Sequence, residues 1–156
     1  MTPFWGYDQA VAAWVAKRIP GCQRGFGDCR ALGVLDGAGQ MAAGVVFHDW
    51  NPEAGIIELS AACTTRRWLT RNVLWQMFSY PFIGCNCQMV VLRVSERNET
   101  ENHRGIQRIS RAYGFQEHRI ERLYGRDHAG ILFTLTDDDW RANGFHKTEM
   151  IDHGKR

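Results

Sequence analysis

Long apolar runs are missing from this sequence, and so are low-complexity tracts and internal repeats. Its apolar stretches stay far below the roughly 18 residues that a membrane-spanning helix requires, and no basic segment followed by an apolar one opens the chain. With 44% hydrophobic and 12% aromatic residues, the 156-residue chain can still bury a substantial core. We therefore expect one domain over residues 1–145, a loose tail over 146–156, no membrane association and a cytoplasmic location.

Patterned cysteines are also missing. The five cysteines are an odd number, and their spacing gives neither paired C-x-x-C ligands nor a disulfide framework. The histidines likewise show no metal-ligand spacing. We expect reduced thiols and no metal site, with Cys85 and Cys87 acting as turn or core residues and Cys63 as a small core residue at a strand end rather than a nucleophile.

The positive charge is concentrated in the middle of the chain. Residues 66–126 contain eleven arginines, no lysine and five acidic residues, whereas the segments before and after each carry a net charge of −2. The planar guanidinium suits phosphate or carboxylate partners. The pattern is typical of a phosphorylated ligand, of nucleic acid or of a solvated helix face, and the overall net charge of +2 does not favour nucleic acid.

Hydrophobic periodicity and turn residues predict alternating helices and strands. The expected elements are a helix over 8–18, strands over 29–35, 41–50 and 56–63, a helix that ends near residue 81, a buried strand over 88–94 and a helix that stops at Gly114. A strand over 116–124, a turn at Gly125 and a last strand that ends near 133 follow. The basic segment 64–71 separates the third strand from the second helix. A helix N-terminus there offers free N–H groups and a positive dipole end, which suit a pyrophosphate.

This order of elements resembles the GNAT superfamily of N-acetyltransferases over about residues 8–140. The most telling parts are 102–115, which resembles the family's helix before a Gly-Phe strand start, and 117–132, which resembles its last two strands. Segments 68–71 and 80–82 are most similar to members from phages and prophages. The resemblance implies an α/β chain of the α+β kind, with a mixed, mostly antiparallel central sheet flanked by helices.

The resemblance also implies a V-shaped gap between the strand that ends near Ala62 and the strand that begins near Gln88. An acyl-CoA would lie in this gap, and its acetyl group would pass directly to an amine in a ternary complex. Asn102 corresponds to a residue that contacts the cofactor arm in relatives, or His103 does if the register differs by one residue. The implied cofactor-binding residues are Ala61, Ala62, Cys63, Arg66, Arg67, Leu69, Thr70, Arg71, Asn72, Asn102 and His103.

The sequence departs from the family pattern at two functional positions. The usual pyrophosphate loop contains closely spaced glycines, but this chain has no glycine between Gly55 and Gly84, so the loop needs a different geometry. The tyrosine that protonates the leaving thiolate in many relatives is replaced by Ser110. Tyr113 and Tyr124 are the nearby alternatives for this acid.

Transfer to an amine requires a base that removes its proton. Glu58 is the first candidate, because a carboxylate on the strand beside the gap can accept the proton directly or through water; alternatively it faces solvent or pairs with an arginine. His48 on the neighbouring strand is the second candidate, against a partly buried, hydrogen-bonded histidine. Ser60 either orients a water or forms a local hydrogen bond.

The resemblance leaves the acceptor open between a small molecule and a peptide amine, and it leaves open a homodimer. By analogy with relatives, Trp5, Tyr7, Trp50 and residues 124–129 are expected near the acceptor. Two other functions compete with the enzyme. One is a noncatalytic acyl-CoA-binding or interaction module. The other is a nucleic-acid-binding or nucleic-acid-modifying protein whose bases would stack on Trp68, Trp75 or Tyr80.

Overall fold

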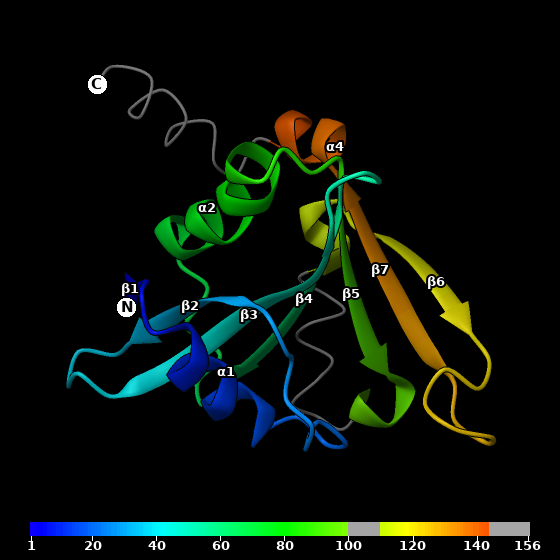
Figure 1. The fold of residues 1–156 in the computed structure, drawn as a ribbon, viewed down its shortest axis with the longest axis horizontal. Helices are drawn as coiled ribbons and strands as arrows, with labels where there is room; N and C mark the ends of the chain where they lie inside the picture. The colour runs from blue at the N-terminus through cyan, green and yellow to red at the C-terminus, as the bar shows by residue number, and fades with distance from the viewer. Residues whose placement is uncertain (100–109, 144–156) are drawn as a thin grey trace.

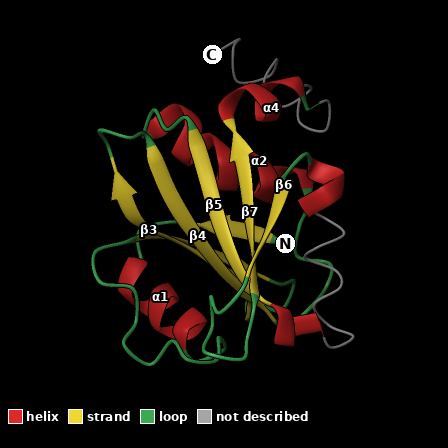
Figure 2. Cartoon of the chain, turned by 90° about the vertical axis from the view of Figure 1, so that its right-hand side faces the viewer, coloured by secondary structure: helices red, strands yellow, loops and turns green. Residues whose placement is uncertain are grey.

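The computed structural model describes residues 1–99 and 110–143, which form one seven-stranded sheet with helices on both faces (Figures 1 and 2). The strands are β1 (Thr2–Phe4), β2 (Arg30–Leu35), β3 (Met41–Asn51), β4 (Ile56–Cys63), β5 (Met89–Ser95), β6 (Gln116–Ile120) and β7 (Gly130–Thr136). The helices are α1 (Asp8–Ala16), α2 (Arg71–Ser79), the π-helical turn η1 (Tyr80–Gly84), the 3-10 turn η2 (Glu96–Glu99) and α4 (Asp137–Ala142).

The strand order is β1-β2-β3-β4-β5-β7-β6. Every neighbouring pair is antiparallel except β4 and β5, which are parallel and joined by the crossover through α2. The predicted mixed, mostly antiparallel sheet flanked by helices is therefore confirmed. None of the helices in the described part of the chain is both long enough and apolar enough to cross a bilayer.

Each face of the sheet has its own hydrophobic core. Strand alternation sends Phe47 and Leu59 toward α2 and α4, where Trp75 and Trp140 stack at 5.7 Å. The opposite face, under α1, holds Val46 and the α1 residues Val11, Ala12 and Val15. Gly44 belongs to this second face, because a Cβ there would lie 2.7 Å from Val15 Cγ2 and would push α1 off the sheet.

The parallel ladder between β4 and β5 is short. Its register runs from Ile56↔Met89 to Leu59↔Leu92 and stops there, although both strands continue. Figure 1 shows the two arrowheads well apart. The predicted V-shaped gap is therefore confirmed, and it opens toward the C-terminal ends of both strands.

Several details differ from the sequence-based expectations or fall outside the described residues. Cys63 was expected in the core, but it is exposed at the end of β4. The strand expected up to residue 124 ends at Ile120, and 121–124 form a turn in which Arg122 has a φ of +61°. The N-terminal edge strand β1 was not expected, because three residues are too few for a periodicity. Asn102, His103 and the expected tail, 146–156, lie outside the described residues.

Candidate active site

The open end of the gap is continuous with the N-terminus of α2. After Cys63, residues 64–70 lead into the helix, whose N-cap Thr70 accepts a hydrogen bond from Val73 N at 3.3 Å. The first intrahelical bond runs from Leu74 N to Thr70 O at 2.9 Å. The amides of Arg71 and Asn72 come before this bond and lie at the positive end of the helix.

The loop before α2 takes its shape from a buried side chain rather than from glycine. Within 64–70, all of which is described, no residue has a positive φ. Trp68 is only 8% exposed and packs into the core beneath, and Thr70 N donates to Trp68 O at 2.9 Å. Arg66 and Arg67 are exposed on the same loop. The loop therefore presents cations and helix amides together, which is the arrangement that an anionic phosphate requires.

Glu58 lies where β4 and β5 part. Its Oε1 is 3.2 Å from Arg93 Nε, and the two side chains are 14% and 52% exposed respectively. Glu58 is in register with Val91, so Arg93, two residues further, emerges on the same face of the sheet. The sequence left open whether Glu58 faces solvent or pairs with an arginine. In the structure it pairs with Arg93, and its side chain is largely buried.

Tyr124 is the tyrosine that the structure places near this ion pair. Its ring lies over Gly130, where a Cβ would be 2.6 Å from Tyr124 Cε2. Burial raises the pKa of the Tyr124 phenol, and the Glu58 carboxylate raises it further, whereas Arg93 lowers it. A phenol with a raised pKa keeps its proton in neutral and mildly alkaline solution, so it can donate it.

The other two acid candidates lie in the core. Tyr113 stacks on Phe78 at 4.9 Å, and burial raises its pKa. Ser110 is buried at the start of the helical residues 110–113, and its carbonyl accepts from Phe115 N at 3.0 Å. Among the described residues, no contact joins the Ser110 hydroxyl to Glu58.

His48 is held at both ring nitrogens. Its Nδ1 lies 2.7 Å from Asp49 Oδ2 and its Nε2 lies 2.8 Å from Ser60 Oγ. The ring is 7% exposed and packs against Phe26 with centroids 4.9 Å apart. His48 is therefore the partly buried, hydrogen-bonded histidine that the sequence left as one alternative, and its Nε2 faces a hydroxyl on the strand that also carries Glu58.

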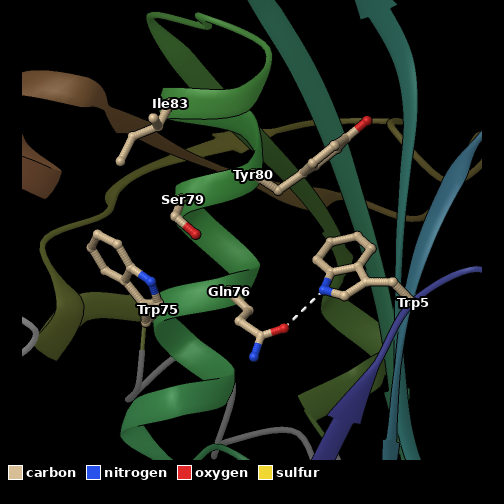
Figure 3. Close-up of a pocket in the computed structure, with 6 residues that line it drawn as sticks. All are labelled: Trp5, Trp75, Gln76, Ser79, Tyr80 and Ile83. Atoms are coloured by element: carbon tan, nitrogen blue, oxygen red, sulfur yellow. Dashed lines mark hydrogen bonds between the residues drawn. The ribbon is translucent and has the colours of Figure 1, made fainter. Parts of the chain in front are cut away.

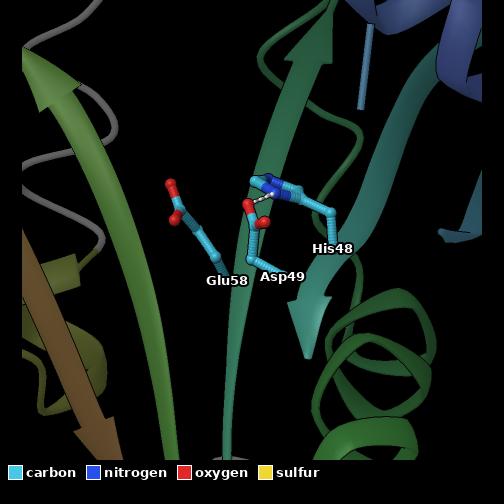
Figure 4. Close-up of side chains that lie close together, drawn as sticks. All are labelled: His48, Asp49 and Glu58. Carbon is cyan, nitrogen blue, oxygen red and sulfur yellow. Dashed lines mark hydrogen bonds and ion pairs between the residues drawn. The ribbon is translucent and has the colours of Figure 1, made fainter. Parts of the chain in front are cut away.

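His48, Asp49 and Glu58, drawn in Figure 4, each offer one possible metal-ligand atom, and these three atoms lie within 4.8 Å of one another. Each carboxylate, however, already has a side-chain partner: Asp49 is hydrogen-bonded to His48, and Glu58 is paired with Arg93. A histidine nitrogen and a carboxylate oxygen 2.7 Å apart share a proton rather than a cation. The cluster therefore has the geometry of a proton network.

His48, Glu58 and Ser60 share one face of the sheet. The register pairs His48 with Glu58, and Ser60 follows two residues later on β4, so the three side chains emerge on the α1 side. The aromatic Trp5 instead stacks on Phe47 at 5.8 Å, on the α2 side. Together with Trp75, Gln76, Ser79, Tyr80 and Ile83 it lines an open pocket of about 360 Å³, shown in Figure 3.

The positions of Trp5, Trp68 and Trp75 bear on two predictions, the acceptor site and the stacking of nucleic-acid bases. Trp5 lies on the face opposite Glu58, so it cannot flank an acceptor held beside that carboxylate. Trp68 is 8% exposed and packs in the core, so its ring cannot receive a nucleic-acid base and that part of the nucleic-acid prediction is wrong; Trp75 is equally buried but lines the pocket of Figure 3.

Asp49, Arg93 and Phe26 are the site residues that sequence reasoning missed. Asp49 reaches His48 because of the register shift at the end of β3, and Phe26 reaches it from the long loop between α1 and β2. Arg93 offered one signal, since it is the charged residue within the otherwise apolar strand 89–94. A buried-strand pattern interrupted by an arginine predicts an acidic partner on the neighbouring strand.

No family model and no curated protein matches the chain. Solved structures do match. A point mutant of the spermidine N-acetyltransferase SpeG from Vibrio cholerae is 11% identical over 92% of this chain and 100% of that chain, with a TM-score of 0.68. A chimera of that protein and hSSAT is 12% identical over the same shares, with a TM-score of 0.69. Mutant forms of the Vibrio cholerae spermidine/spermine N-acetyltransferase SpeG are 15% identical over 74% and 69% of the chains, with a TM-score of 0.60. The chain therefore has the fold of the GNAT acetyltransferases.

Proposed function

We propose that this protein is an acyl-CoA-dependent N-acyltransferase that passes an acetyl group from acetyl-CoA directly to an amine. The observation that carries the proposal is the ladder between β4 and β5, which in the described part of the chain stops at Leu59↔Leu92, before the end of β4 from which residues 64–70 lead to α2. The fold shared with spermidine N-acetyltransferases supports an amine acceptor. Such an acceptor would be a small-molecule or peptide amine.

The residues around the gap fit the parts of this cofactor. Beyond Leu59, backbone groups of β4 on the side of β5 have no ladder partner among the described residues, so those of Ala61, Ala62 and Cys63 that point to this edge can hydrogen-bond the amides of an extended arm as a strand would. The Arg71 and Asn72 amides, with Arg66 and Arg67 beside them, suit the pyrophosphate. When bound, acetyl-CoA supplies the acetyl group as an activated thioester.

The protein's own groups supply the proton transfers. Glu58, held by Arg93, is placed to take a proton from an amine that approaches on the α1 face of the gap. Tyr124, whose pKa is raised, is placed to give a proton to the leaving group. Asp49, which is 76% exposed, adds negative charge that attracts a cationic amine to this face.

Two finer assignments accompany the proposal. We propose a member close to the phage-type subgroup, which the similarity of 68–71 and 80–82 to such members supports. All five cysteines are free, which suits a reducing compartment such as the cytoplasm.

Calorimetric titration with acetyl-CoA tests the cofactor, and thiol release against polyamines, other small amines and peptides tests the reaction. We expect saturable binding and amine-dependent thiol release. Absence of binding would overturn the proposal. Binding without turnover on any amine would instead favour a noncatalytic acyl-CoA-binding module.

A further inference from the structure

Asp49, His48 and Ser60 form a linear hydrogen-bonded chain. A carboxylate only accepts hydrogen bonds, so the 2.7 Å contact assigns the ring hydrogen to His48 Nδ1. When this ring is neutral, its lone pair is on Nε2, which can accept a hydrogen bond from the Ser60 hydroxyl 2.8 Å away. This is the order in which a base activates a hydroxyl while a carboxylate fixes the base.

The backbone is distorted in the way that this chain requires. In a regular strand, His48 and Asp49 would point to opposite faces of the sheet. The register of β3 with β4 shifts between His48 and Asn51, and Asp49 adopts a left-handed conformation with a φ of +50°. The bulge turns the Asp49 carboxylate back onto His48, at the strain cost of about 1 kcal/mol or more that a left-handed non-glycine residue carries.

The serine and histidine are also placed for chemistry. Phe26 packs on the His48 ring and fixes its orientation, while Ser60 is half-buried and is the first residue of β4 beyond the ladder with β5. The backbone of Ser60 therefore lies at the narrow end of the gap, while its hydroxyl contacts His48 on β3. Backbone amides of β4 that face β5 beyond Leu59 can donate to an oxygen that becomes negative next to Ser60.

We propose that Ser60 is a nucleophile that accepts an acyl group from an activated ester or thioester, with His48 as its base and Asp49 as the positioning residue. The bond from Ser60 Oγ to the acyl carbon forms as the hydroxyl proton passes to His48 Nε2. The bond from the acyl carbon to the leaving oxygen or sulfur then breaks, and His48 Nε2 protonates the leaving group.

Water or an amine then takes the acyl group from Ser60. It loses a proton to His48 Nε2 and forms a bond to the acyl carbon, the ester bond to Ser60 breaks, and Ser60 Oγ regains the proton. This acyl-serine activity goes beyond direct transfer, since it requires neither CoA nor the α2 phosphate site.

The test uses p-nitrophenyl acetate on the full-length protein without CoA. We expect a burst of nitrophenol, and peptide mapping by mass spectrometry should place one acetyl group on Ser60. Ser60→Ala should abolish this adduct, whereas Ser60→Cys, which keeps a nucleophile, should carry the acetyl group at the same position. Asp49→Asn should slow acylation by about 100-fold or more, with thermal unfolding confirming that each variant is folded.

Ser79→Ala is the matched control. Ser79 lies on α2 in the pocket of Figure 3, on the other face of the sheet, and its replacement should leave Ser60 acylation unchanged. Acetyl groups found only on lysines, on other serines or on none would overturn the proposal, as would equal acylation of folded wild type and Asp49→Asn. Amine acetylation from acetyl-CoA without any Ser60 adduct would refute the acyl-serine alone, whereas a Ser60 adduct without acetyl-CoA binding would support it and refute the proposed function.

Discussion

Replacing Glu58 by Gln removes one negative charge at the narrow end of the gap and keeps the shape of the side chain. If Glu58 takes the proton from the amine, its loss removes general-base catalysis, which contributes about 10²- to 10⁴-fold to a rate. This range corresponds to about 3–5 kcal/mol of activation free energy. We expect turnover to fall by this factor while the dissociation constant of acetyl-CoA changes little, because Glu58 precedes the open part of β4.

The structure limits how much of this effect can arise from stability. The partner, Arg93, is 52% exposed, and ion pairs that water reaches contribute about 0–1 kcal/mol. Thermal unfolding of Glu58→Gln should therefore stay close to that of the wild type. If Glu58→Gln unfolded at a much lower temperature, the ion pair would be structural. The fall in turnover would then not identify Glu58 as the general base.

Two further variants separate the base from the ion pair. Arg93→Met breaks the same contact but leaves the carboxylate, so it should cost much less turnover than Glu58→Gln. Glu53→Gln changes an exposed glutamate in the turn between β3 and β4 and should have no effect. Amine-dependent thiol release measures all three. Unchanged turnover in Glu58→Gln, or equal losses in Glu58→Gln and Arg93→Met, would refute the assignment of Glu58 as base.

Arg67→Ala should weaken acetyl-CoA binding by about 10-fold, since hydrogen bonds to charged groups contribute about 1.5–3 kcal/mol; an unchanged calorimetric dissociation constant would contradict the phosphate site. Gly130→Ala places a methyl group 2.6 Å from the Tyr124 ring, so the ring must shift by about 1 Å to reach normal contact. Turnover should fall, and ultraviolet titration should show the pKa of Tyr124 moving down toward 10 as its burial decreases. Burial raises the pKa of Cys87 to about 11, so about a thousandth of it is thiolate at pH 8. Ellman-type labelling at that pH should therefore modify the exposed Cys63 long before Cys87, and equal rates would contradict the burial.

Much of the fold can be predicted from hydrophobic periodicity and turn residues in the sequence. The alternation around Val45 to His48 and the turn at 51–55 predict a meander, and the apolar stripe of Val73, Leu74, Met77 and Phe78 predicts α2. The parted strands were expected only through resemblance to a family, because no periodicity records where a ladder stops. The family resemblance also allowed Glu58 to be predicted as the base, because it is the carboxylate on the strand beside the expected gap.

The partners of the site residues could not be predicted, because they depend on register and on irregular backbone. Strand alternation places Asp49 and His48 on opposite faces, and only the bulge brings them together. The contact between Glu58 and Arg93 joins strands that are parallel neighbours across a helical crossover. Tyr124 was expected within a strand, but the positive φ of Arg122 turns the chain, and the tyrosine then lies over Gly130.

The few register pairs between β4 and β5 divide the reacting groups between two stretches of the chain. His48 and Glu58 belong to the stretch that ends at Cys63, whereas Arg93 and Tyr124 belong to the stretch beyond residue 88. The acyl-serine chain of Asp49, His48 and Ser60 lies wholly in the first stretch, but the groups proposed for transfer from acetyl-CoA to an amine lie in both. The proposed amine transfer therefore depends on the completed sheet, and separated fragments must reassociate before it can proceed.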